Sequence, residues 1–422
     1  MTLRATIDGA RLLSRIKELS RLTTTPGHGV TREAWTPLDV VARDRVADWM
    51  REAGLHAEVD AAANLIGWTT SNGGRWLASG SHLDTVVHGG PLDGAYGVIA
   101  AVEVAASLRR AGHVMRHGLL VAALANEEGA RGTPGMTGSH ACVGDLGATV
   151  LDEPDDDGIR LRDRIAEAGG APDHIESARW PADTIDAFVE LHVEQGPVLD
   201  RTGTPIGVVS AITGRQALDV HISGTANHAG TTPMGMRRDA LAAAAEIVLA
   251  VEDLPGGEGV RVATCGHLAA VPNVRNVVPG TVLLGIELRD ERTEAIERAM
   301  SELDVVLEGV GERRGVTIER HWGQRVPPRL AHPAVAASVR HATAANGLDI
   351  AELPSGAGHD AQVLAAAVPI GMIFVPSIGG ISHSPEERTD PEHLVAGAQV
   401  LLDTLLDLDE RFPDGPWLGA TP

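Results

Sequence analysis

Apolar runs that end in polar residues alternate with helical segments in the first 130 residues of this chain. The run Trp76–His82 indicates a short buried strand, Gly97–Arg110 is rich in Ala and Val and indicates a helix, and Gly118–Ala125 indicates a second buried strand. Strands joined by a helical crossover pair in parallel, and such sheets carry helices on both faces. The pattern therefore predicts an α/β fold with a mixed, mainly parallel sheet flanked by helices, and with its chemistry at the carboxyl ends of the strands.

The pattern changes near Gly214 and returns after Pro327. Between these points the expected order is strand, helix, strand, strand, helix and strand, which is the split βαβ of a ferredoxin-like α+β module. The expected strands are 216–223, 260–270, 277–289 and 316–321, and the expected helices are 239–253 and 291–313. We therefore expect a discontinuous main domain of residues 1–212 and 327–422, with an inserted domain of residues 213–326.

The bulk properties of the chain disfavour several classes of protein. At 422 residues the chain exceeds the size at which one hydrophobic core stops growing, so two domains are expected. A net charge of −22 disfavours nucleic acid and anionic membrane surfaces as partners. Two cysteines, Cys142 and Cys265, cannot form a disulfide framework, and no window reaches about 18 uninterrupted apolar residues. We expect a cytoplasmic protein.

Histidines and carboxylates occur in four separate segments of the chain. Some of these residues lie directly at the ends of predicted strands. Imidazole nitrogen and carboxylate oxygen are the ligands that borderline divalent metals such as Zn²⁺ take in hydrolytic centres. Taken alone, His82 could be a buried core histidine and Asp93-Gly94 an ordinary turn, but the combination indicates a metal centre. The candidate ligands are His82, Asp93, Glu128, His192 and His383.

Glu127 and Glu128 directly follow the buried strand that ends at Ala125. Neighbouring side chains point apart, so one carboxylate can bind metal while the other faces the water beside it. Because coordination lowers the pKa of water towards about 7, that second carboxylate can act as a general base. We predict that Glu128 is a ligand and Glu127 the base. The five candidate ligands fit two ions better than one, provided that Asp93 bridges them.

Together these residues resemble the M20 metallohydrolases, and within them the N-carbamoyl-L-amino acid hydrolase and allantoate amidohydrolase group. The surroundings of His192 distinguish this group from peptidase-like M20 members. The resemblance covers nearly the whole chain and is carried by Gly80-Ser-His-Leu-Asp-Thr85, Asp93-Gly94, Asn126-Glu-Glu-Gly129, Leu191-His-Val-Glu-Gln-Gly-Pro197, the segment 224–234, Pro272-Asn-Val-Arg-Asn-Val-Val-Pro-Gly280, Glu287-Leu-Arg289 and Ser355-Gly-Ala-Gly-His-Asp-Ala361.

The resemblance implies a role for each candidate residue. It implies that His82, Asp93 and His192 hold one metal ion, and that Asp93, Glu128 and His383 hold the second. Glu127 is then the base and afterwards the proton donor. The main domain becomes a di-metal catalytic domain and the inserted domain a lid and dimerisation domain. The implied substrate contacts are Gln195, Asn276, Arg289 and the glycine turn at Gly358, with His228 stabilising the oxyanion from the lid of a partner subunit.

The reaction expected from these roles is hydrolysis of a ureido or amide C–N bond in a small carboxylate substrate by metal-activated water. The substrate would be an N-carbamoyl-L-amino acid, allantoate or a similar compound, and the protein a homodimer. Two divalent ions per subunit are expected, Zn²⁺ or Mn²⁺, and Co²⁺ or Ni²⁺ also accept these ligands. Two alternatives remain open, namely an M20 aminoacylase or dipeptidase that cleaves ordinary amides, and a non-catalytic metal-binding protein.

Overall fold

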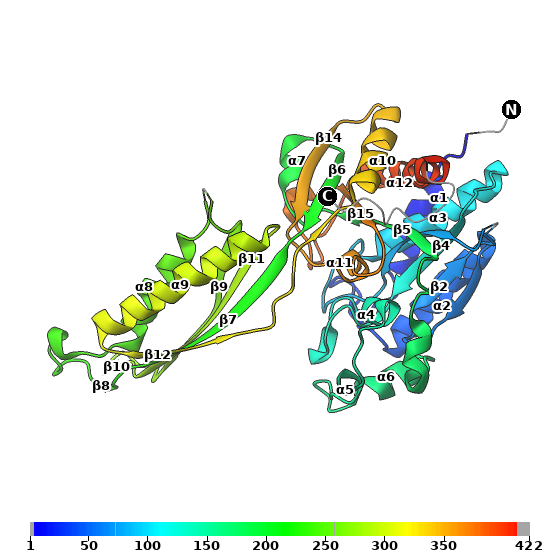
Figure 1. The fold of residues 1–422 in the computed structure, drawn as a ribbon. Coiled ribbons are helices and arrows are strands. Elements are labelled where there is room, and N and C mark those ends of the chain that lie inside the picture. The colour runs from blue at the N-terminus through cyan, green and yellow to red at the C-terminus, as the bar shows by residue number, and fades with distance from the viewer. Residues whose placement is uncertain (1–3, 72, 257, 412–422) are drawn as a thin grey trace. The chain divides into compact units, whose positions relative to one another are not determined.

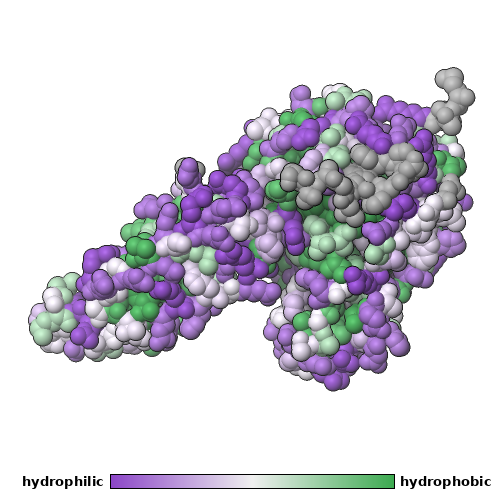
Figure 2. All heavy atoms as spheres, in the orientation of Figure 1, coloured by the Kyte–Doolittle hydropathy of each residue, from purple (hydrophilic) through white to green (hydrophobic). Residues whose placement is uncertain are grey.

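The computed structural model describes residues 4–71, 73–256 and 258–411, and the chain divides into two compact units. Unit 1 comprises residues 1–210 and 330–422, and unit 2 comprises residues 211–329. The sequence placed these boundaries after residues 212 and 326. Among the described residues, no helix is both long and apolar enough to cross a membrane. Hydrophilic residues dominate the visible surface of each unit, and smaller apolar areas are scattered among these residues (Figure 2).

Unit 1 is built on one mixed β-sheet whose described strands lie in the order β1-β2-β4-β3-β5-β15-β6-β13, with β14 paired to β6. The strands are β1 His56–Val59, β2 Leu65–Trp68, β3 Trp76–His82, β4 Gly118–Leu124, β5 Ile185–Val193, β6 Ile206–Ile212, β13 Arg329–Leu330, β14 Ile350–Ser355 and β15 Ile370–Val375. The helices are α1 Gly9–Leu19, α2 Pro37–Glu52, α3 Ala95–Ala111, α4 Thr137–Val143, α5 Ala148–Leu151, α6 Leu161–Glu167, α7 Val198–Thr202, α10 Pro333–Ala345, α11 Asp360–Leu364 and α12 Pro391–Arg411, with short 3₁₀ turns at Ala130–Gly132, Pro172–Ala178 and Ile378–Gly380.

Parallel pairing is confined to the centre of this sheet. The pairs β3–β4, β3–β5 and β5–β15 are parallel, whereas β1–β2, β2–β4 and β6–β15 are antiparallel. The expectation of a mixed sheet flanked by helices is thus confirmed, but the sheet is less parallel than predicted. The difference arises on both sides of the parallel centre, where the short hairpin of β1 and β2 pairs antiparallel with β4 and β6 pairs antiparallel with β15.

Helices cover both faces of the sheet in unit 1, which explains why its central strands are almost entirely buried. Helices α1, α3, α10 and α12 lie on one face, and α4 and α11 lie on the other (Figure 1). Every residue of β4 and β5 is buried, as expected for strands covered on both sides. Gly80 of β3 illustrates how tight the packing is, because a Cβ there would lie 1.9 Å from the carbonyl oxygen of Ala122 on β4.

Unit 2 is a four-stranded antiparallel sheet with two helices packed on it. The sheet order is β12-β7-β11-β9, which places the first and third strands in the middle, as in a ferredoxin-like module. Inward residues of β7 alternate with exposed ones, so one face packs on the helices. The elements are β7 Gly214–Ser223, β8 Asn227–His228, a 3₁₀ turn at Met234–Met236, α8 Ala240–Glu252, β9 Val262–Val271, β10 Val277–Val278, β11 Thr281–Asp290, α9 Thr293–Arg314 and β12 Thr317–Trp322.

One predicted strand of unit 2 is wrong in its extent. The single strand expected over 277–289 is two strands, because the ladder stops at Val278 and starts again at Thr281. Pro279 lies in this interruption and has no N–H to donate. The first piece, β10, pairs with β8 instead of with the main sheet.

Candidate metal centre

The candidate metal ligands of unit 1 converge because their strands are neighbours in the sheet. His82 is the last residue of β3, Glu128 follows β4, His192 lies near the end of β5, and His383 follows β15. The strands β4, β3, β5 and β15 are adjacent and parallel, so their carboxyl ends meet at one edge. Asp93 joins them from the loop that precedes the N-cap of α3.

Asp93 lies between two groups of side chains. Its Oδ1 is 3.2 Å from Nε2 of His192 and 3.5 Å from Nε2 of His82. Its Oδ2 is 3.1 Å from Nε2 of His383, which is also 3.5 Å from Oε2 of Glu128. Within each group the ligand atoms lie within 4.8 Å of one another. Five side chains therefore form two triads that share one aspartate.

The hydrogen bonds of His82 and His192 leave one ring nitrogen of each facing Asp93. Nδ1 of His82 lies 3.0 Å from the carbonyl oxygen of Asp84, and Nδ1 of His192 lies 2.8 Å from that of Val193. A carbonyl oxygen only accepts, so each Nδ1 carries the proton. Each Nε2 then faces Oδ1 of Asp93, and that of His192 also accepts a hydrogen bond from the backbone N–H of Gly94 at 3.2 Å. This is the orientation that metal-ligating histidines adopt.

A second observation also fits a divalent cation. Oε1 of Glu128 is buried and has no hydrogen-bond partner among the described residues. A buried carboxylate oxygen without a partner is costly unless an ion or a water compensates it. Imidazole and carboxylate donors in this number suit Zn²⁺ and its neighbours.

The pKa values in the cluster reflect the burial of its carboxylates and their contacts with the histidines. Burial alone would raise the pKa of Asp93, but hydrogen bonds from His192, His383 and His82 hold it well below its usual range. The hydrogen bond to Asp93 raises the pKa of His383 to about 9, against the effect of burial. Burial, with the charge of Asp93, raises the pKa of Glu128 to about 7. A bound cation would take the place of these protons, so metal uptake depends on pH.

Glu127 lies beside the cluster, with a side chain 10% exposed and Oε2 3.8 Å from Nε2 of His82. Burial raises its pKa well above the usual value, and the charges of Asp360, Glu128 and Asp93 add to this, while His82 opposes it. A carboxylate with a raised pKa suits proton transfer near neutral pH. Its atoms also form a triad with His82 and Glu128, so geometry alone permits Glu127 as a ligand.

The comparisons with known proteins identify the family. The model of peptidase family M20/M25/M40 matches residues 78–407. The chain belongs to this family.

Similar proteins match over nearly the whole chain. It is 40% identical to an N-carbamoyl-L-amino acid amidohydrolase of Geobacillus stearothermophilus, over 95% of this chain and 99% of that protein. It is 34% identical to an allantoate amidohydrolase of Bacillus subtilis, with 93% and 96% covered. A solved amidase of the hydantoinase/carbamoylase family from Burkholderia multivorans superposes with a TM-score of 0.88 at 33% identity, covering 96% of this chain and 98% of that one. The resemblance inferred from sequence is confirmed.

Asp84 is part of this metal centre, although the sequence did not indicate a role for it. Its carboxylate accepts hydrogen bonds from the backbone N–H groups of Glu127 and Glu128, at 3.3 and 3.2 Å, while its carbonyl oxygen lies against His82. Asp84 therefore ties the end of β3 to the end of β4. The sequence offers only an acid two residues after a strand-end histidine, and its burial is visible only in the structure.

Two predicted substrate contacts lie in unit 1. The side-chain amide of Gln195 donates to Oδ2 of Asp93 at 2.8 Å and to Oγ of Ser382 at 3.2 Å. Gln195 therefore contacts the shared aspartate. Gly358 lies in the turn between β14 and α11, where a Cβ would approach Cε of Met136 to 2.7 Å. The next residue, His359, is buried with its ring centroid 4.7 Å from that of His192.

The other three predicted site residues lie in unit 2, two of them beyond one end of β11 and the third near its other end. The exposed His228 is on β8, and the backbone N–H of its neighbour Ala229 donates to the carbonyl of Asn276. Both residues lie beyond the Thr281 end of β11, whereas Arg289 is near the other end, where its Nε donates to Oε1 of Glu287 at 2.6 Å. The eight steps from Thr281 to Arg289 span about 26 Å at roughly 3.3 Å per residue.

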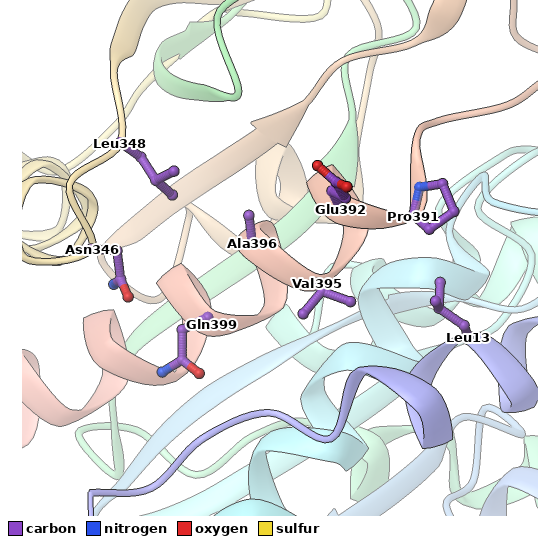
Figure 3. Close-up of a pocket in the computed structure, with 8 residues that line it drawn as sticks. All are labelled: Leu13, Asn346, Leu348, Pro391, Glu392, Val395, Ala396 and Gln399. Atoms are coloured by element: carbon purple, nitrogen blue, oxygen red, sulfur yellow. The ribbon is translucent and has the colours of Figure 1, made fainter.

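A hollow of about 570 Å³ lies elsewhere in unit 1 and contains none of the predicted site residues. It is bounded by α1, the start of α12 and the turn after α10 (Figure 3). Its walls are mainly apolar, with Glu392, Asn346 and Gln399 among the lining residues. It contributes no ligand or base to the metal centre. The lining residues are Leu13, Asn346, Leu348, Pro391, Glu392, Val395, Ala396 and Gln399.

Proposed function

We propose that this protein is a metal-dependent amidohydrolase that cleaves the ureido C–N bond of a small carboxylate substrate. The observation that carries the proposal is the pair of triads sharing Asp93, with Glu127 beside them. The substrate class is supported by the near full-length similarity to N-carbamoyl-L-amino acid amidohydrolases and an allantoate amidohydrolase. For a carbamoyl substrate and one water, the products are the amino acid, ammonia and carbon dioxide.

The metal centre holds two divalent ions in this proposal. His82, Asp93 and His192 bind one, and Asp93, Glu128 and His383 bind the other. When bound, such ions polarise a carbonyl oxygen and lower the pKa of a water. Zn²⁺ or Mn²⁺ is the proposed metal, and Co²⁺ and Ni²⁺ also accept these ligands.

Glu127 transfers the proton in this reaction. Its carboxylate removes a proton from the attacking water and afterwards donates it to the nitrogen that leaves as the C–N bond breaks. The raised pKa of Glu127 favours the second step, because the protonated form persists long enough to act as an acid. Asp84 keeps Glu127 beside the cluster through the hydrogen bond from its backbone N–H.

Recognition of the substrate requires two copies of the chain. A guanidinium fork at Arg289 suits a carboxylate, and His228 and Asn276 offer polar groups for the oxyanion and the ureido end. Because His228 lies beyond the Thr281 end of β11 and Arg289 lies near the other end of this strand, a small substrate cannot contact both within a single chain. We propose a homodimer in which His228 and Asn276 of the partner subunit complete the site.

The proposed homodimer forms through unit 2. Strand β9 is an edge of the described sheet and exposes Val262, Leu268 and Val271. The neighbouring helix α8 exposes Leu249, which is 60% accessible. An unpaired edge strand with exposed apolar side chains is suited to pairing with a second copy. Unit 2 thereby acts as the lid and dimerisation domain.

A substrate panel tests the proposed function. Protein stripped of metal by a chelator is reloaded separately with Zn²⁺, Mn²⁺, Co²⁺ or Ni²⁺. Ammonia release from N-carbamoyl-L-amino acids and allantoate is then compared with amine release from N-acetyl amino acids and dipeptides. We expect at least one metal to restore cleavage of a ureido substrate. Cleavage confined to acetyl amides or dipeptides would instead establish an aminoacylase or dipeptidase, and no cleavage with any metal would favour a non-catalytic binding protein.

A further inference from the structure

Glu387 joins the two loops that carry Asp93 and His383. It lies four residues after His383 and is 4% exposed. Its Oε2 accepts hydrogen bonds from the backbone N–H groups of Leu92 at 2.8 Å and of Asp93 at 3.1 Å. Its Oε1 accepts one from Oγ of Ser382 at 2.8 Å. The buried carboxylate of Glu387 therefore links the backbone of Asp93 to Ser382, the residue directly before His383.

The loop before α3 is shaped to receive this carboxylate. A Cβ at Gly90 would lie 2.0 Å from Oε2 of Glu387, so only glycine leaves room for it. The two donating N–H groups directly precede Gly94, the N-cap of α3. Negative charge is favoured at the N-terminus of a helix, and charge-assisted hydrogen bonds are stronger than neutral ones. The position thus suits a carboxylate better than an amide.

A chain of hydrogen bonds extends from Glu387 to the carboxylate of Asp93 itself. Ser382 donates to Glu387 and accepts from Nε2 of Gln195, which also donates to Oδ2 of Asp93. Glu387 therefore fixes the backbone of Asp93 directly and its side chain through Ser382 and Gln195.

We propose that Glu387 is a positioning residue that holds Asp93 and His383 in the positions needed to bind metal. Removing the groups that orient metal ligands typically weakens metal affinity by about 10- to 100-fold. The inference rests on the proposed function, because it requires that Asp93 and His383 bind metal. It adds a residue outside both triads whose loss should weaken binding without removing any ligand.

The test compares Glu387→Gln with Glu386→Gln. The control residue is the adjacent exposed glutamate, whose side chain contacts Ser384. For each full-length protein, Zn²⁺ affinity is measured by competition with a chelator, and the melting temperature is measured with and without Zn²⁺. We expect Glu387→Gln to bind the weaker of two ions about tenfold less tightly than the control does. Its melting temperature without metal should stay within a few degrees of the control, and the rise caused by Zn²⁺ should shrink.

Two outcomes would overturn the proposal. Zn²⁺ affinity equal to that of the control would show that Glu387 does not position the ligands. A lower melting temperature in both conditions, with unchanged affinity, would assign Glu387 a purely structural role. Should Glu387→Gln fail to fold, Ser382→Ala removes the hydrogen-bond link to Oε1 and must weaken Zn²⁺ binding in the same direction.

A variant that lacks one proposed metal ligand distinguishes failure of the positioning role of Glu387 from failure of the proposed function. His383→Ala removes a proposed ligand and should abolish binding of one ion. If His383→Ala loses an ion but Glu387→Gln binds as the control does, only the positioning role is wrong. If His383→Ala binds both ions as the wild type does, the ligand assignment itself is wrong.

Discussion

His117 should make the free energy of unfolding depend on pH, because it is buried between two carboxylates. It directly precedes β4 and is 5% exposed. Its Nε2 lies 3.0 Å from Oδ2 of Asp186, and its Nδ1 lies 2.8 Å from Oδ1 of Asp409 near the end of α12. Arg75 also pairs with Asp186. The charged imidazolium therefore links the last helix of the described chain to the centre of the sheet.

The size of the effect follows from the pKa of His117. Burial alone would lower the pKa, but the hydrogen bonds to Asp186 and Asp409 outweigh it and raise the pKa from 6.5 to about 9. That difference corresponds to about 3 kcal/mol in favour of the charged form in the folded protein. Because the folded pKa exceeds the unfolded one, this stabilisation is complete below about pH 6.5. It is lost as the pH rises through about 9.

The assay is urea unfolding of the wild type and of His117→Gln at several pH values between 6 and 10. The control is His174→Gln, since His174 is an exposed histidine with a side chain 77% accessible. We expect the stability difference between wild type and His117→Gln to be about 3 kcal/mol larger at pH 6 than at pH 10. An equal difference across this range would show that the charge on His117 contributes nothing to stability.

Three further substitutions test other parts of the account. Glu127→Gln should lower kcat by about 10²- to 10⁴-fold while metal content stays unchanged; turnover within a few-fold of wild type would refute its role as base. Arg289→Lys should raise KM for a carboxylate substrate about tenfold, since the bidentate fork is lost, and an unchanged KM would argue against this contact. Gly80→Ala should destabilise unit 1 by about 3 kcal/mol in thermal unfolding, because its Cβ would overlap the carbonyl of Ala122. Gly356→Ala, where an added Cβ meets nothing within 4 Å, is the control, and equal stability of the two variants would contradict the packing argument.

The sequence predicts the central strands of unit 1 well because their apolar runs have clear ends. The predicted strand at Trp76–His82 has the bounds of β3, and the strand at Gly118–Ala125 differs from β4 by one residue. The hairpin of β1 and β2 was not predicted, since each strand has only four residues. Helix α12 was also not predicted, although it has the periodicity of an amphipathic helix and packs its apolar side chains on α3 and α10.

The candidate ligands could be predicted because strand ends and adjacency in the sheet together determine where they meet. Asp84 and Glu387 could not be assigned in this way, because both act by accepting hydrogen bonds from backbone N–H groups. Such contacts depend on how two loops approach each other, and no spacing of residues along the chain encodes that approach. The separation of His228 from Arg289 likewise became visible only through the register of β7 with β11.

The central claim is that Asp93 is shared by two metal ions. Anomalous diffraction from crystals of the wild-type protein grown with Mn²⁺ tests it most directly. We expect two peaks per chain, one on each side of the Asp93 carboxylate and about 3.5–4 Å apart. A single peak, or peaks that Asp93 does not contact, would show that Asp93 does not bridge two ions.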